Sequence, residues 1–595
     1  MKTKVLSLLL AAALIVTTFA ACGGEPASSS SQSSESSASS ESSAADSDSS
    51  ESSAESQASA GDDIMAARAV HSPNDDLSQP YSYVTYANYD WWTIHPWGAD
   101  AASAKMKELF NVDVDWQKPD ADPAAKFNLM ISSGDIPDTI FLDRTADFVK
   151  IAKLGLLVDL NTLKYDGCTI DQDLDESTQK INSYEDKFYM IPNWSRRMGT
   201  GGNYSWIINQ EAWKAVGSPE LKTLEDVHQC LLKMKDAGLK SSAGADLIPF
   251  MVGDTPDGGK ILDGFYRSFG GTPRQNCWTA RVDGKMQFLF RDPVAKEALK
   301  EANKWYREGL MTDTIVTDTV DQVNEKLSTG RAGIAFYDFS QDSVTHFRQI
   351  LMEATGGANS YEVLTDPIFP AAEGVDKVYG EENAGAGGSG LVITTTAKNP
   401  QRIFDLNSWM LTNDGSLNMM YGPQGGLWDE LDENGLPILK KAESEFTTEE
   451  KDAQGCWMWA SPAQADNVDN MKFALNALQP KEKQDWTITL QANVFSQEAG
   501  GSYKDGQKFV SNESVDMNLT IDPQEDLGIK RTLIENQVRA ELPKMVLAPD
   551  DATFDSIYQG LIDFADQNGM KEIEAKYDEK YQANCELQGG SFYAK

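Results

Sequence analysis

The stretch VDVDWQKPDADPAAKFNLMISSGDIPDTIFL, residues 112–142, predicts a strand, a helix and a second strand in direct succession. Residues 112–116 have the apolar–polar alternation of a strand, and Asp122, which proline follows, has the residue type that begins a helix. The helical pattern stops at Gly134, and the apolar run 139–142 has the length of a buried strand. Strand-helix-strand units of this kind are the building blocks of a parallel sheet.

The same alternation continues on both sides of this unit. Residues 83–88 have the pattern of a strand and residues 101–110 that of a helix, and a further helix is expected from Thr145 to Gly155. A second region of the same kind begins near residue 204. Its expected elements are a strand at 206–208, helices at 224–234 and 293–308, strands at 333–337 and 391–395, and a helix at 400–411. The pattern predicts an α/β fold with two lobes.

The N-terminal residues predict export and attachment to a membrane. Two lysines precede the apolar stretch 5–21, which is the layout of an export signal. The residues that end this stretch, Phe-Ala-Ala-Cys22, resemble the lipobox of bacterial lipoproteins, whose cysteine is acylated and becomes the new N-terminus. The alternative is an ordinary signal peptide cut near Ala21.

A spacer follows the signal. From 27 to 60 every residue is Ala, Ser, Glu, Asp or Gln, so the tract has no large apolar surface to offset the entropy of ordering. A flexible coil of about 35 residues reaches roughly 30 Å, enough to hold a folded body clear of lipid headgroups. We therefore predict a signal peptide at 1–22, a disordered tether at 23–79, and localisation at the extracellular face of a bacterial cell membrane.

Composition argues against several classes of protein. The 595-residue chain has 52 Lys and Arg against 91 Asp and Glu, a formal net charge of −39, and a surface of that sign repels nucleic acid and acidic polymers. The 6 cysteines include no C-x-x-C pair and the 4 histidines include no pair at i, i+4, so neither a disulfide framework nor a zinc site is expected. After the signal, no other apolar stretch is long enough to span a bilayer.

An ordered set of short motifs resembles one protein family. The motifs are SGDIPDTIFLD at 133–143, GLLVDL at 155–160, YMIPN at 189–193, WIIN at 206–209, GRAG at 330–333 and AKNP at 397–400. In this order and spacing they resemble the extracellular solute-binding lipoproteins of ABC importers, of the family 1 type that includes sugar and oligosaccharide binders. The resemblance covers nearly the whole body after the tether.

This resemblance implies a periplasmic-binding-protein type II fold, in which crossing strands join two lobes that close over a ligand. Carried onto this chain, lobe 1 is 80–200 plus 334–412 and lobe 2 is 201–333 plus 413–595. The resemblance further implies a monomer that captures a carbohydrate, in particular an oligosaccharide. Such a protein passes its ligand unaltered to the membrane subunits of an ABC transporter.

Loop tryptophans are the candidate ligand-stacking residues, because the flat face of an indole packs on the C–H face of a pyranose. They are Trp91, Trp92, Trp194, Trp278, Trp428 and Trp457. Trp92 and Trp278 are the preferred pair, because one would rim the strand ends of the first lobe and the other those of the second. Packing in a hinge or a lid is the alternative for each.

Polar candidates lie at the ends of predicted strands. Asp143 and Arg144 come directly past the carboxyl end of a strand, where open α/β sheets hold ligands, and the family resemblance implies that this pair bonds sugar hydroxyls. Asp338 follows another strand in the same way, and Tyr337 beside it is a further stacking candidate.

No cofactor, metal or catalytic machinery is expected. GAGGSG at 385–390 matches G-x-G-x-x-G, but its strand comes after the motif and not before it, so dinucleotide binding is not predicted. Asp171, Asp173 and Asp175 leave calcium open, although the glycine of an EF-hand turn is missing. The chain has neither a G-x-S-x-G nor an H-E-x-x-H motif. The alternatives are a secreted carbohydrate-active enzyme and a binding protein for peptide or another non-sugar solute.

Overall fold

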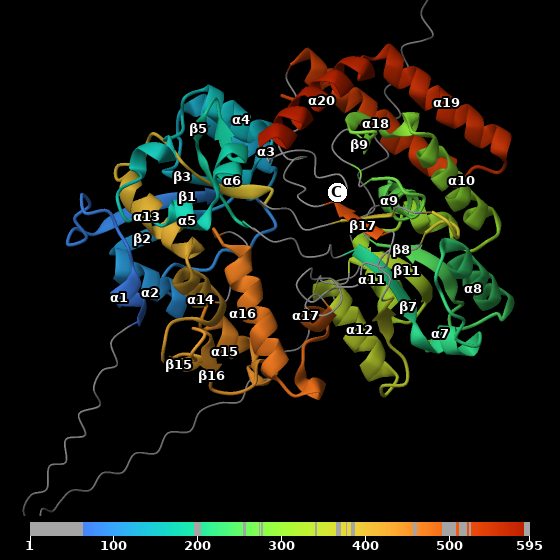
Figure 1. The fold of residues 1–595 in the computed structure, drawn as a ribbon, viewed down its shortest axis with the longest axis horizontal. Helices are drawn as coiled ribbons and strands as arrows, with labels where there is room; N and C mark the ends of the chain where they lie inside the picture. Colours follow the sequence, from blue (N-terminus) through green and yellow to red (C-terminus); the bar gives the residue numbers. More distant parts are fainter. Residues whose placement is uncertain are drawn as a thin grey trace, which may run out of the picture. The chain divides into compact units, whose positions relative to one another are not determined.

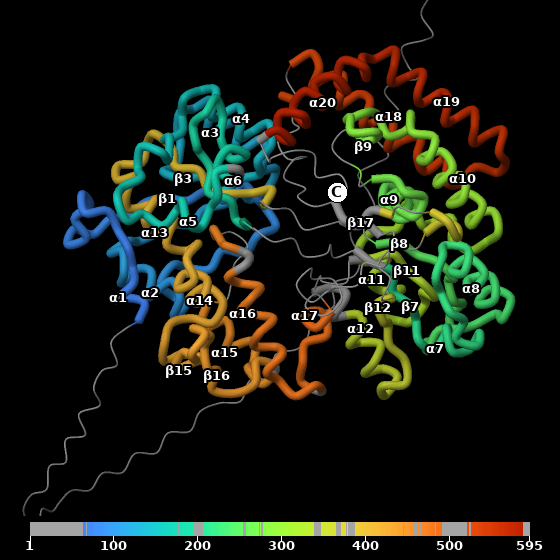
Figure 2. Tube along the Cα trace, viewed as in Figure 1, coloured from blue at the N-terminus to red at the C-terminus, as the bar shows by residue number. Residues whose placement is uncertain are grey.

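The computed structural model describes most of the chain after residue 63. The described residues are 64–195, 204–253, 257–272, 274, 278–338, 342–364, 370–375, 378–381, 387–455, 461–490, 507–510, 521–522 and 525–587. All of them belong to the unit Gly61–Lys595, which Figure 1 draws as a ribbon and Figure 2 as a tube. Of the predicted functional residues, Cys22 and Trp457 lie outside the described residues.

The first sheet begins with the predicted alternation of strands and helices, which is confirmed. In chain order the elements are β1 (Tyr81–Ala87), α2 (Ala101–Phe110), β2 (Val112–Gln117), α3 (Pro123–Ser133), β3 (Thr139–Asp143) and α4 (Ala146–Lys153). Asp122 caps α3 by accepting a hydrogen bond from the backbone N–H of Ala125 at 3.0 Å, and Gly134 ends the helix with a φ of 74°. β1 lies parallel to both β2 and β3.

Strands from later in the chain complete this sheet. β6 (Met190–Pro192) and β14 (Ser389–Ile393) extend the strand order to β2-β1-β3-β14-β6, with β14 antiparallel to both neighbours. Phe141 packs into a core with α2 and α13 (Pro400–Leu411), whereas Ile140 and Leu142 join a core on the other face with α3 and α4. Successive strand residues point to opposite faces, so a strand that is covered on both faces is apolar throughout.

A second sheet has the strand order β12-β7-β11-β8. Its strands are β7 (Tyr204–Asn209), β8 (Ile248–Val252), β11 (Ala332–Asp338) and β12 (Tyr361–Val363). β11 is parallel to β8 and antiparallel to β7. One face packs against α8 (Leu224–Asp236), α9 (Gly259–Ser268) and α10 (Pro293–Arg307), and the other against α11 (Val320–Ser328) and α12 (Asp342–Ala354). Each sheet therefore has hydrophobic cores of its own.

The predicted lobe boundaries are wrong in two places. Residues 334–363, assigned to lobe 1, form most of β11, α12 and β12, which pair with or pack on the second sheet. Residues 413–475, assigned to lobe 2, include α14 (Asn413–Tyr421) and most of α16 (Ala465–Leu478), whose buried residues join the core of the first sheet. Pairing between distant segments decides lobe membership, and a local hydrophobic period carries no information about it.

The predicted tether also ends earlier than expected. α1 (Ile64–Arg68) buries Met65 in the first core, and the backbone N–H of Ser72 donates to Asp405 Oδ2 at 2.7 Å. Asp75 forms a buried ion pair with Arg402 of α13. Residues 64–79, which we call the N-terminal strap, therefore belong to the folded body and not to a tether at 23–79. They differ from the serine-rich tract in having apolar and charged groups with partners in the first lobe.

The remaining elements are short or lie near the C-terminus. They are η1 (Leu160–Leu163), α5 (Ile170–Asp173), α6 (Glu176–Ile181), β4 (Ser183–Tyr184), β5 (Lys187–Phe188), α7 (Gln210–Ala215), β9 (Thr279–Val282), β10 (Lys285–Phe288), η3 (Leu289–Arg291), η4 (Asp313–Val316), β13 (Val378–Glu381), β15 (Trp428–Leu431), β16 (Pro437–Leu439), η5 (Glu443–Glu445), α15 (Thr448–Asp452), η6 (Lys481–Lys483), α17 (Trp486–Leu490), β17 (Gln507–Val510), α18 (Asp526–Val546), α19 (Asp551–Gln567) and α20 (Met570–Leu587). The last three helices, red in Figure 1, pack into the core of the second sheet.

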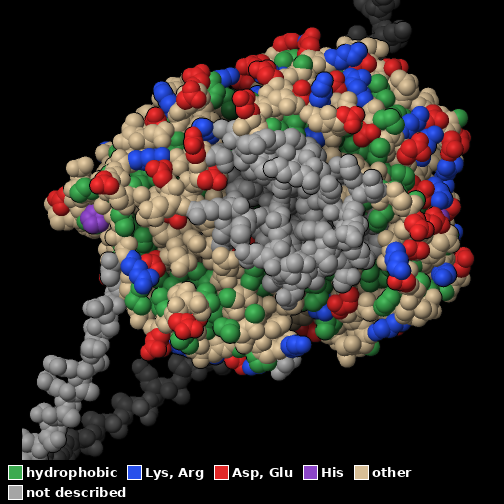
Figure 3. Space-filling view, in the orientation of Figure 1, with side chains coloured by type: hydrophobic (Ala, Val, Ile, Leu, Met, Phe, Trp, Pro, Cys, Tyr) green, Lys and Arg blue, Asp and Glu red, His purple; other side chains and the backbone are tan. Residues whose placement is uncertain are grey.

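The surface displays both acidic and basic side chains. On the face drawn in Figure 3, acidic and basic side chains are interspersed. Within the described part of the chain, none of the helices combines the length and the apolar composition needed to cross a bilayer.

Candidate functional site

The ends of β1, β3 and β6 meet the start of β14 at one edge of the first sheet. β1 and β3 are parallel, so the residues after Ala87 and the residue Asp143 reach the same edge. β14 is antiparallel, with Ser389 opposite Asp143 and Gly390 opposite Pro192. We call this region the first-sheet edge, and it comprises residues 88–92, 143–144, 193–194 and 387–389. The carboxyl ends of parallel strands are where open α/β sheets hold ligands.

Asp143 is the centre of a hydrogen-bonded group at this edge. Its Oδ1 accepts the hydroxyl of Tyr89 at 2.7 Å and the hydroxyl of Ser389 at 2.7 Å. The residue is exposed, and among the described residues none donates a hydrogen bond to its Oδ2. Burial of the tyrosine, together with the charge of Asp143, raises the pKa of Tyr89 above its usual value, so its hydroxyl remains a donor. The edge thus presents a carboxylate that is held in place and keeps acceptor capacity.

Two adjacent tryptophans in the loop after β1 differ in burial. Trp91 is 62% exposed, and its ring centroid lies 5.6 Å from that of Tyr89. Trp92 is 8% exposed and packs edge-on against Trp116 at 5.0 Å, while Lys118 Nζ donates to its carbonyl oxygen at 2.7 Å. One indole therefore anchors the loop in the core, while the other faces solvent. Burial of Trp92 argues against its predicted stacking role, and Trp91 stays a candidate.

Arg144 lies inside the lobe, which contradicts the prediction that it bonds sugar hydroxyls beside Asp143. Its Nη1 donates to Oδ1 of Asn182 at 2.7 Å, and its backbone N–H donates to the carbonyl oxygen of Gly388 at 2.6 Å. Burial lowers the pKa of Arg144 to about 9, which leaves the guanidinium charged at neutral pH. The side chain supports the strand ends from within the lobe.

The described part of the glycine-rich motif, residues 387–390, serves close backbone packing at this edge. The backbone N–H of Gly387 donates to the carbonyl oxygen of Trp194 at 2.5 Å, and that of Asn193 donates to Ser389 at 2.9 Å. A Cβ on Gly387 would lie 2.1 Å from Oδ1 of Asn193, and one on Gly390 would lie 2.6 Å from a backbone oxygen. The glycines are thus needed for the approach of β14 to β6. Trp194 itself is half-buried beside them and remains a candidate.

Trp278, the preferred residue of the second lobe, is covered by the protein. It is 3% exposed, and the guanidinium of Arg274 lies 4.4 Å from the centre of its ring. Asp263 fixes that guanidinium through Nε at 3.0 Å and Nη2 at 3.1 Å. Burial acts to raise the pKa of Asp263, but the charges of Arg274 and Arg267 lower it below the usual range. One face of the indole is therefore already stacked on a cation of the chain itself.

Two further aromatic candidates are core residues. Tyr337 is 1% exposed, donates its hydroxyl to Oδ1 of Asn324 at 2.9 Å, and packs against Phe347. Trp428 has no exposed surface, and its indole N–H donates to the carbonyl oxygen of Gly422 at 2.9 Å. These rings have no face open to a ligand, which contradicts their predicted stacking role. A residue in a loop or at a strand end is buried whenever another segment packs over it.

The remaining acidic candidates are Asp338 and the alternating acids Asp171, Asp173 and Asp175. The backbone of Asp338 ends β11 opposite Tyr204, and its side chain lies outside the described residues. Of the acids that left calcium open, Asp171 pairs with Lys164 Nζ at 2.6 Å. Asp175 caps α6 by accepting a hydrogen bond at 2.7 Å. These two carboxylates thus have protein partners of different kinds.

Two connections link the first-sheet edge to other strands, one to β7 of the second sheet and one to β13. Ser195 follows β6 and Tyr204 begins β7, so nine residue steps separate them and their Cα atoms lie within about 32 Å. Glu381 ends β13 and is six steps from Gly387, a reach of about 21 Å. β11 ends opposite the start of β7, so the first of these connections leads to the carboxyl end of β11.

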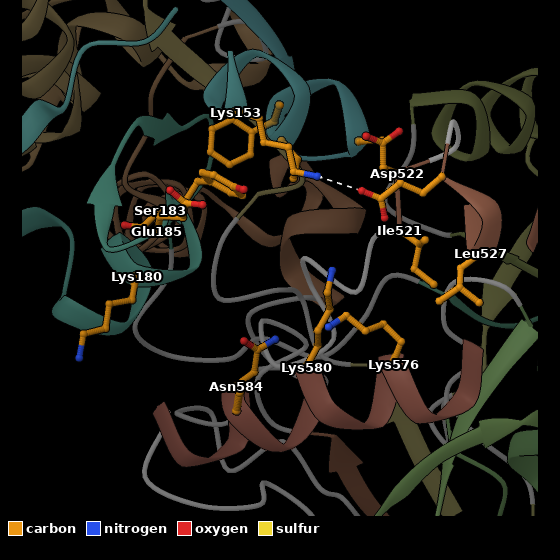
Figure 4. A pocket seen from close by; sticks show the side chains of 16 residues that line it. Lys153, Lys180, Ser183, Glu185, Ile521, Asp522, Leu527, Lys576, Lys580 and Asn584 are labelled. Carbon is orange, nitrogen blue, oxygen red and sulfur yellow. Dashed lines mark hydrogen bonds and ion pairs between the residues drawn. The ribbon is translucent and has the colours of Figure 1, made fainter. Parts of the chain in front are cut away.

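A pocket of about 510 Å³ lies between α4 and β4 on one side and α18 and α20 on the other, and no residue of the first-sheet edge lines it. Lys153 Nζ lies 3.1 Å from a carboxylate oxygen of Glu525 across it. In Figure 4, Lys580 extends toward this pair and Lys576 lies next to Lys580, whereas Lys180 points away. Burial lowers the pKa of Lys580 to about 8, and the nearby Lys576 adds to that shift. Lysines and acids both line the pocket, which adjoins α4, the helix that begins just after Asp143.

Sequence reasoning missed several residues of the edge. Tyr89 and Ser389 hold Asp143, and Lys118 ties down the loop that carries Trp91. Tyr89 follows a predicted strand, so the rule that selected Asp143 would also have selected it. No signal in the sequence marks Ser389 or Lys118, because each reaches the edge from a distant segment.

No family model matches this chain. It is 25% identical over 308 residues to the fructooligosaccharide ABC transporter substrate-binding protein FusA of Streptococcus pneumoniae serotype 4. That match covers 50% of this chain and 54% of the relative, so the chain spans about half the length of the curated relative it matches.

Solved structures extend the likeness over most of the chain. The complex of FusA with kestose has a TM-score of 0.58 at 20% identity and covers 84% of this chain and 100% of that one. The alginate-binding protein AlgQ2 without calcium ion has a TM-score of 0.61 at 15% identity and covers 84% and 98%. A human-milk-oligosaccharide (HMO) binding protein associated with an ABC transporter, from Bifidobacterium longum infantis, has a TM-score of 0.60 at 16% identity and covers 84% and 99%.

The chain has the fold of the ABC-transporter solute-binding proteins. The predicted resemblance and the predicted α/β fold class of the periplasmic-binding-protein type are confirmed. In a solute-binding fold, the first-sheet edge occupies the carboxyl ends of the strands of one lobe, and the chain crosses from it to the other lobe.

Proposed function

We propose that this chain is the substrate-binding component of an ABC importer, that it captures an oligosaccharide at the first-sheet edge, and that it passes the sugar unaltered to the membrane permease. The observation that carries the proposal is the exposed indole of Trp91 beside Tyr89 and the anchored carboxylate of Asp143. The relatives named above are binding proteins for fructooligosaccharide, alginate and human-milk oligosaccharide, which supports a carbohydrate ligand.

The chemistry of the edge suits a sugar. An exposed indole offers a flat apolar face to the C–H groups of a pyranose or furanose ring. Asp143 Oδ2 accepts a sugar hydroxyl, while Tyr89 and Ser389 hold the carboxylate through Oδ1. A hydrogen bond to a charged acceptor contributes about 1.5–3 kcal/mol, so the edge has one stacking group and one strong acceptor for orientation.

Capture is a shift between open and closed arrangements of the lobes. Contacts that a ligand makes with both lobes favour the closed form, which is the form that a permease recognises. The proposal includes the predicted anchor: a lipid on Cys22 and the serine-rich tract after it would hold a monomeric binding body at the extracellular face of the membrane.

Binding measurements test the proposal directly. Thermal-shift and calorimetric titrations would use kestose and longer fructooligosaccharides, human-milk oligosaccharides, alginate oligomers and a mixture of short peptides. A ligand that binds only the folded state raises the melting temperature, and at 100 times its Kd it adds about 2.7 kcal/mol. We expect one oligosaccharide class to raise it, and chromatography of the recovered sugar to show an unchanged pool.

Matched variants locate the site. We expect Trp91→Ala and Asp143→Asn each to weaken sugar binding at least about tenfold, or about 1.4 kcal/mol, with little loss of stability. Leu129→Ala removes another exposed apolar side chain of the first lobe, 59% exposed on α3, and should bind like the wild type. Trp92→Ala should instead cost about 3–5 kcal/mol of folding stability, because its ring is buried.

Each failure has its own meaning. If no sugar raises the melting temperature but peptides do, the ligand class is wrong. If sugar binds and Trp91→Ala behaves like Leu129→Ala, the site is wrong while the function stands. If the sugar pool is cleaved, the chain is an enzyme.

A further inference from the structure

A histidine is buried between α8 and α10 of the second lobe, far in sequence from the first-sheet edge. The ring of His228 stacks on Trp305, with centroids 5.5 Å apart and an interplanar angle of 13°, and its side chain is 4% exposed. Carboxylates surround this ring from both helices: Glu225 comes from α8, Glu301 lies on α10, and Glu308 directly follows α10. Four histidines occur in the whole chain, so a buried one among acids calls for a physical explanation.

The two ring nitrogens of His228 have different surroundings. Nε2 lies 2.5 Å from Oε2 of Glu308, which accepts the Nε2 proton. Nδ1 is buried, has no hydrogen-bond partner, and lies 3.6 Å from Oε2 of Glu225. With the proton on Nε2, the Nδ1 lone pair and the Glu225 carboxylate are two acceptors that face each other. An unsatisfied acceptor in a buried site costs stability, so this arrangement favours a cation between the two atoms.

The distances suit a metal ion better than a hydrogen bond. Zinc binds imidazole nitrogen at about 2.0–2.1 Å and carboxylate oxygen at about 2.0–2.2 Å, which places two donors of a tetrahedral site about 3.4 Å apart. The measured separation of Nδ1 and Glu225 Oε2 is 3.6 Å. One ligand atom each from Glu225, His228 and Glu301 lie within 4.8 Å of one another, so Glu301 needs a side-chain shift on the order of 1 Å to complete the set.

The carboxylates are oriented for this role by bonds to their other oxygens. Gln229 donates to Oε1 of Glu225 at 2.7 Å. Lys304 and Trp305 donate to Oε1 of Glu301 at 3.0 and 2.9 Å. In both residues the hydrogen bonds made within the described part of the chain thus leave Oε2 for another partner.

We propose that Glu225, His228 and Glu301 bind a divalent transition-metal ion of the zinc type, with Glu308 orienting the histidine through Nε2. A mixed imidazole and carboxylate donor set suits zinc and manganese, whereas calcium and magnesium prefer oxygen donors alone. A histidine that binds a metal usually donates its other ring N–H to a carboxylate, which is the arrangement of His228 and Glu308. The ion would join α8 to α10 and stabilise the second lobe, apart from sugar capture.

Titration of metal into stripped protein tests this site. The full chain, treated with EDTA and dialysed, would be titrated with zinc chloride by calorimetry, and bound zinc would be counted by elemental analysis. We expect one saturable equivalent and a higher melting temperature, and no such rise with magnesium or calcium at the same concentration. Nitrogen NMR of the histidine side chains should show the Nε2–H form of His228 before metal and a shifted Nδ1 signal after it.

Variants separate a ligand set from a structural histidine. Glu225→Gln and Glu301→Gln should each weaken zinc binding at least about tenfold, and Glu308→Gln by about 10–100-fold through the orientation of the ring. Asp236→Asn, which changes an exposed acid near the end of α8, should bind zinc like the wild type. Sugar binding should survive removal of the metal, so this result is independent of the proposed function.

Two outcomes would overturn the proposal. One is stripped wild-type protein that takes up no saturable equivalent of zinc at micromolar concentrations. The other is Glu225→Gln that binds zinc as tightly as Asp236→Asn, with an unshifted Nδ1 signal in the wild type. In either case His228 is a packing residue of the interface between α8 and α10.

Discussion

Asp75→Asn tests whether the N-terminal strap is part of the folded body. Side-chain exposure is 6% for Asp75 and 1% for Arg402, and the two form an ion pair to which Asn399 adds a hydrogen bond at 2.8 Å. The substitution keeps the shape of the side chain and removes its charge. Arg402 keeps its bonds to carbonyl oxygens, including that of Phe110 at 2.8 Å, but its buried charge loses its counter-ion.

The expected cost follows from burial. Removing one partner of a buried ion pair costs about 3–5 kcal/mol, because the remaining charge is left uncompensated in a poorly hydrated site. Asp113 provides the matched control: it pairs with Lys107 at the surface, where the side chains are 51% and 49% exposed. Exposed pairs contribute about 0–1 kcal/mol, so Asp113→Asn should change stability by no more than that.

Equilibrium unfolding in urea, followed by circular dichroism, measures both variants. We expect Asp75→Asn to lose at least 2 kcal/mol more than Asp113→Asn, from about 3–5 kcal/mol against about 0–1 kcal/mol. Burial acts to raise the pKa of Asp75, but its bonds to Arg402 and Asn399 lower it below the usual value. The pair therefore stabilises the protein above about pH 4, and its contribution disappears as the pH falls through the lowered pKa. Equal losses in the two variants at neutral pH would mean that the strap is not held by this pair.

Further substitutions test burial and close packing elsewhere. Burial raises the pKa of Asp405 to about 6, so the folded state holds the carboxyl proton more tightly than the unfolded state does. The stability of the wild type should therefore fall as the pH rises from about 4 to about 6, by up to about 3 kcal/mol. Asp405→Asn should lack this fall, and parallel pH profiles of the two melting temperatures would contradict the assignment. Gly415→Ala would place a Cβ 2.1 Å from the backbone oxygen of Trp409 and should cost at least about 1–3 kcal/mol in urea unfolding. Gly560 lies in α19, where an added Cβ would have no atom within 4 Å, so Gly560→Ala should instead stabilise the folded protein by about 0.5–1 kcal/mol. Equal effects of the two glycine changes would refute the packing argument.

Helix starts were predictable because their signals are local. Asp122 caps α3, Asp292 caps α10 ahead of its proline, and Thr223 forms a capping box with Asp226 at the start of α8. In each case the donor and the acceptor lie within three residues of each other. The order of strands and helices in the first lobe was predictable for the same reason.

The candidate site was predictable only in part. The rule that ligands gather at the carboxyl ends of strands selected Asp143, and the structure places it with Trp91 at one edge of the first sheet. The same reasoning could not rank the tryptophans, because exposure depends on what packs over each ring. Trp92 is covered by Trp116, and Trp278 by Arg274.

The sequence by itself determined the elements of this protein, the caps that begin its helices, and the strand end at which a ligand site should be sought. Only the tertiary structure decided which segments share a sheet, where the folded body begins, and which aromatic rings reach solvent. The reason is the range of the forces involved. Caps and hydrophobic periods act over a few residues, whereas Ser389 meets Asp143 across 246 residues and Arg402 meets Asp75 across 327.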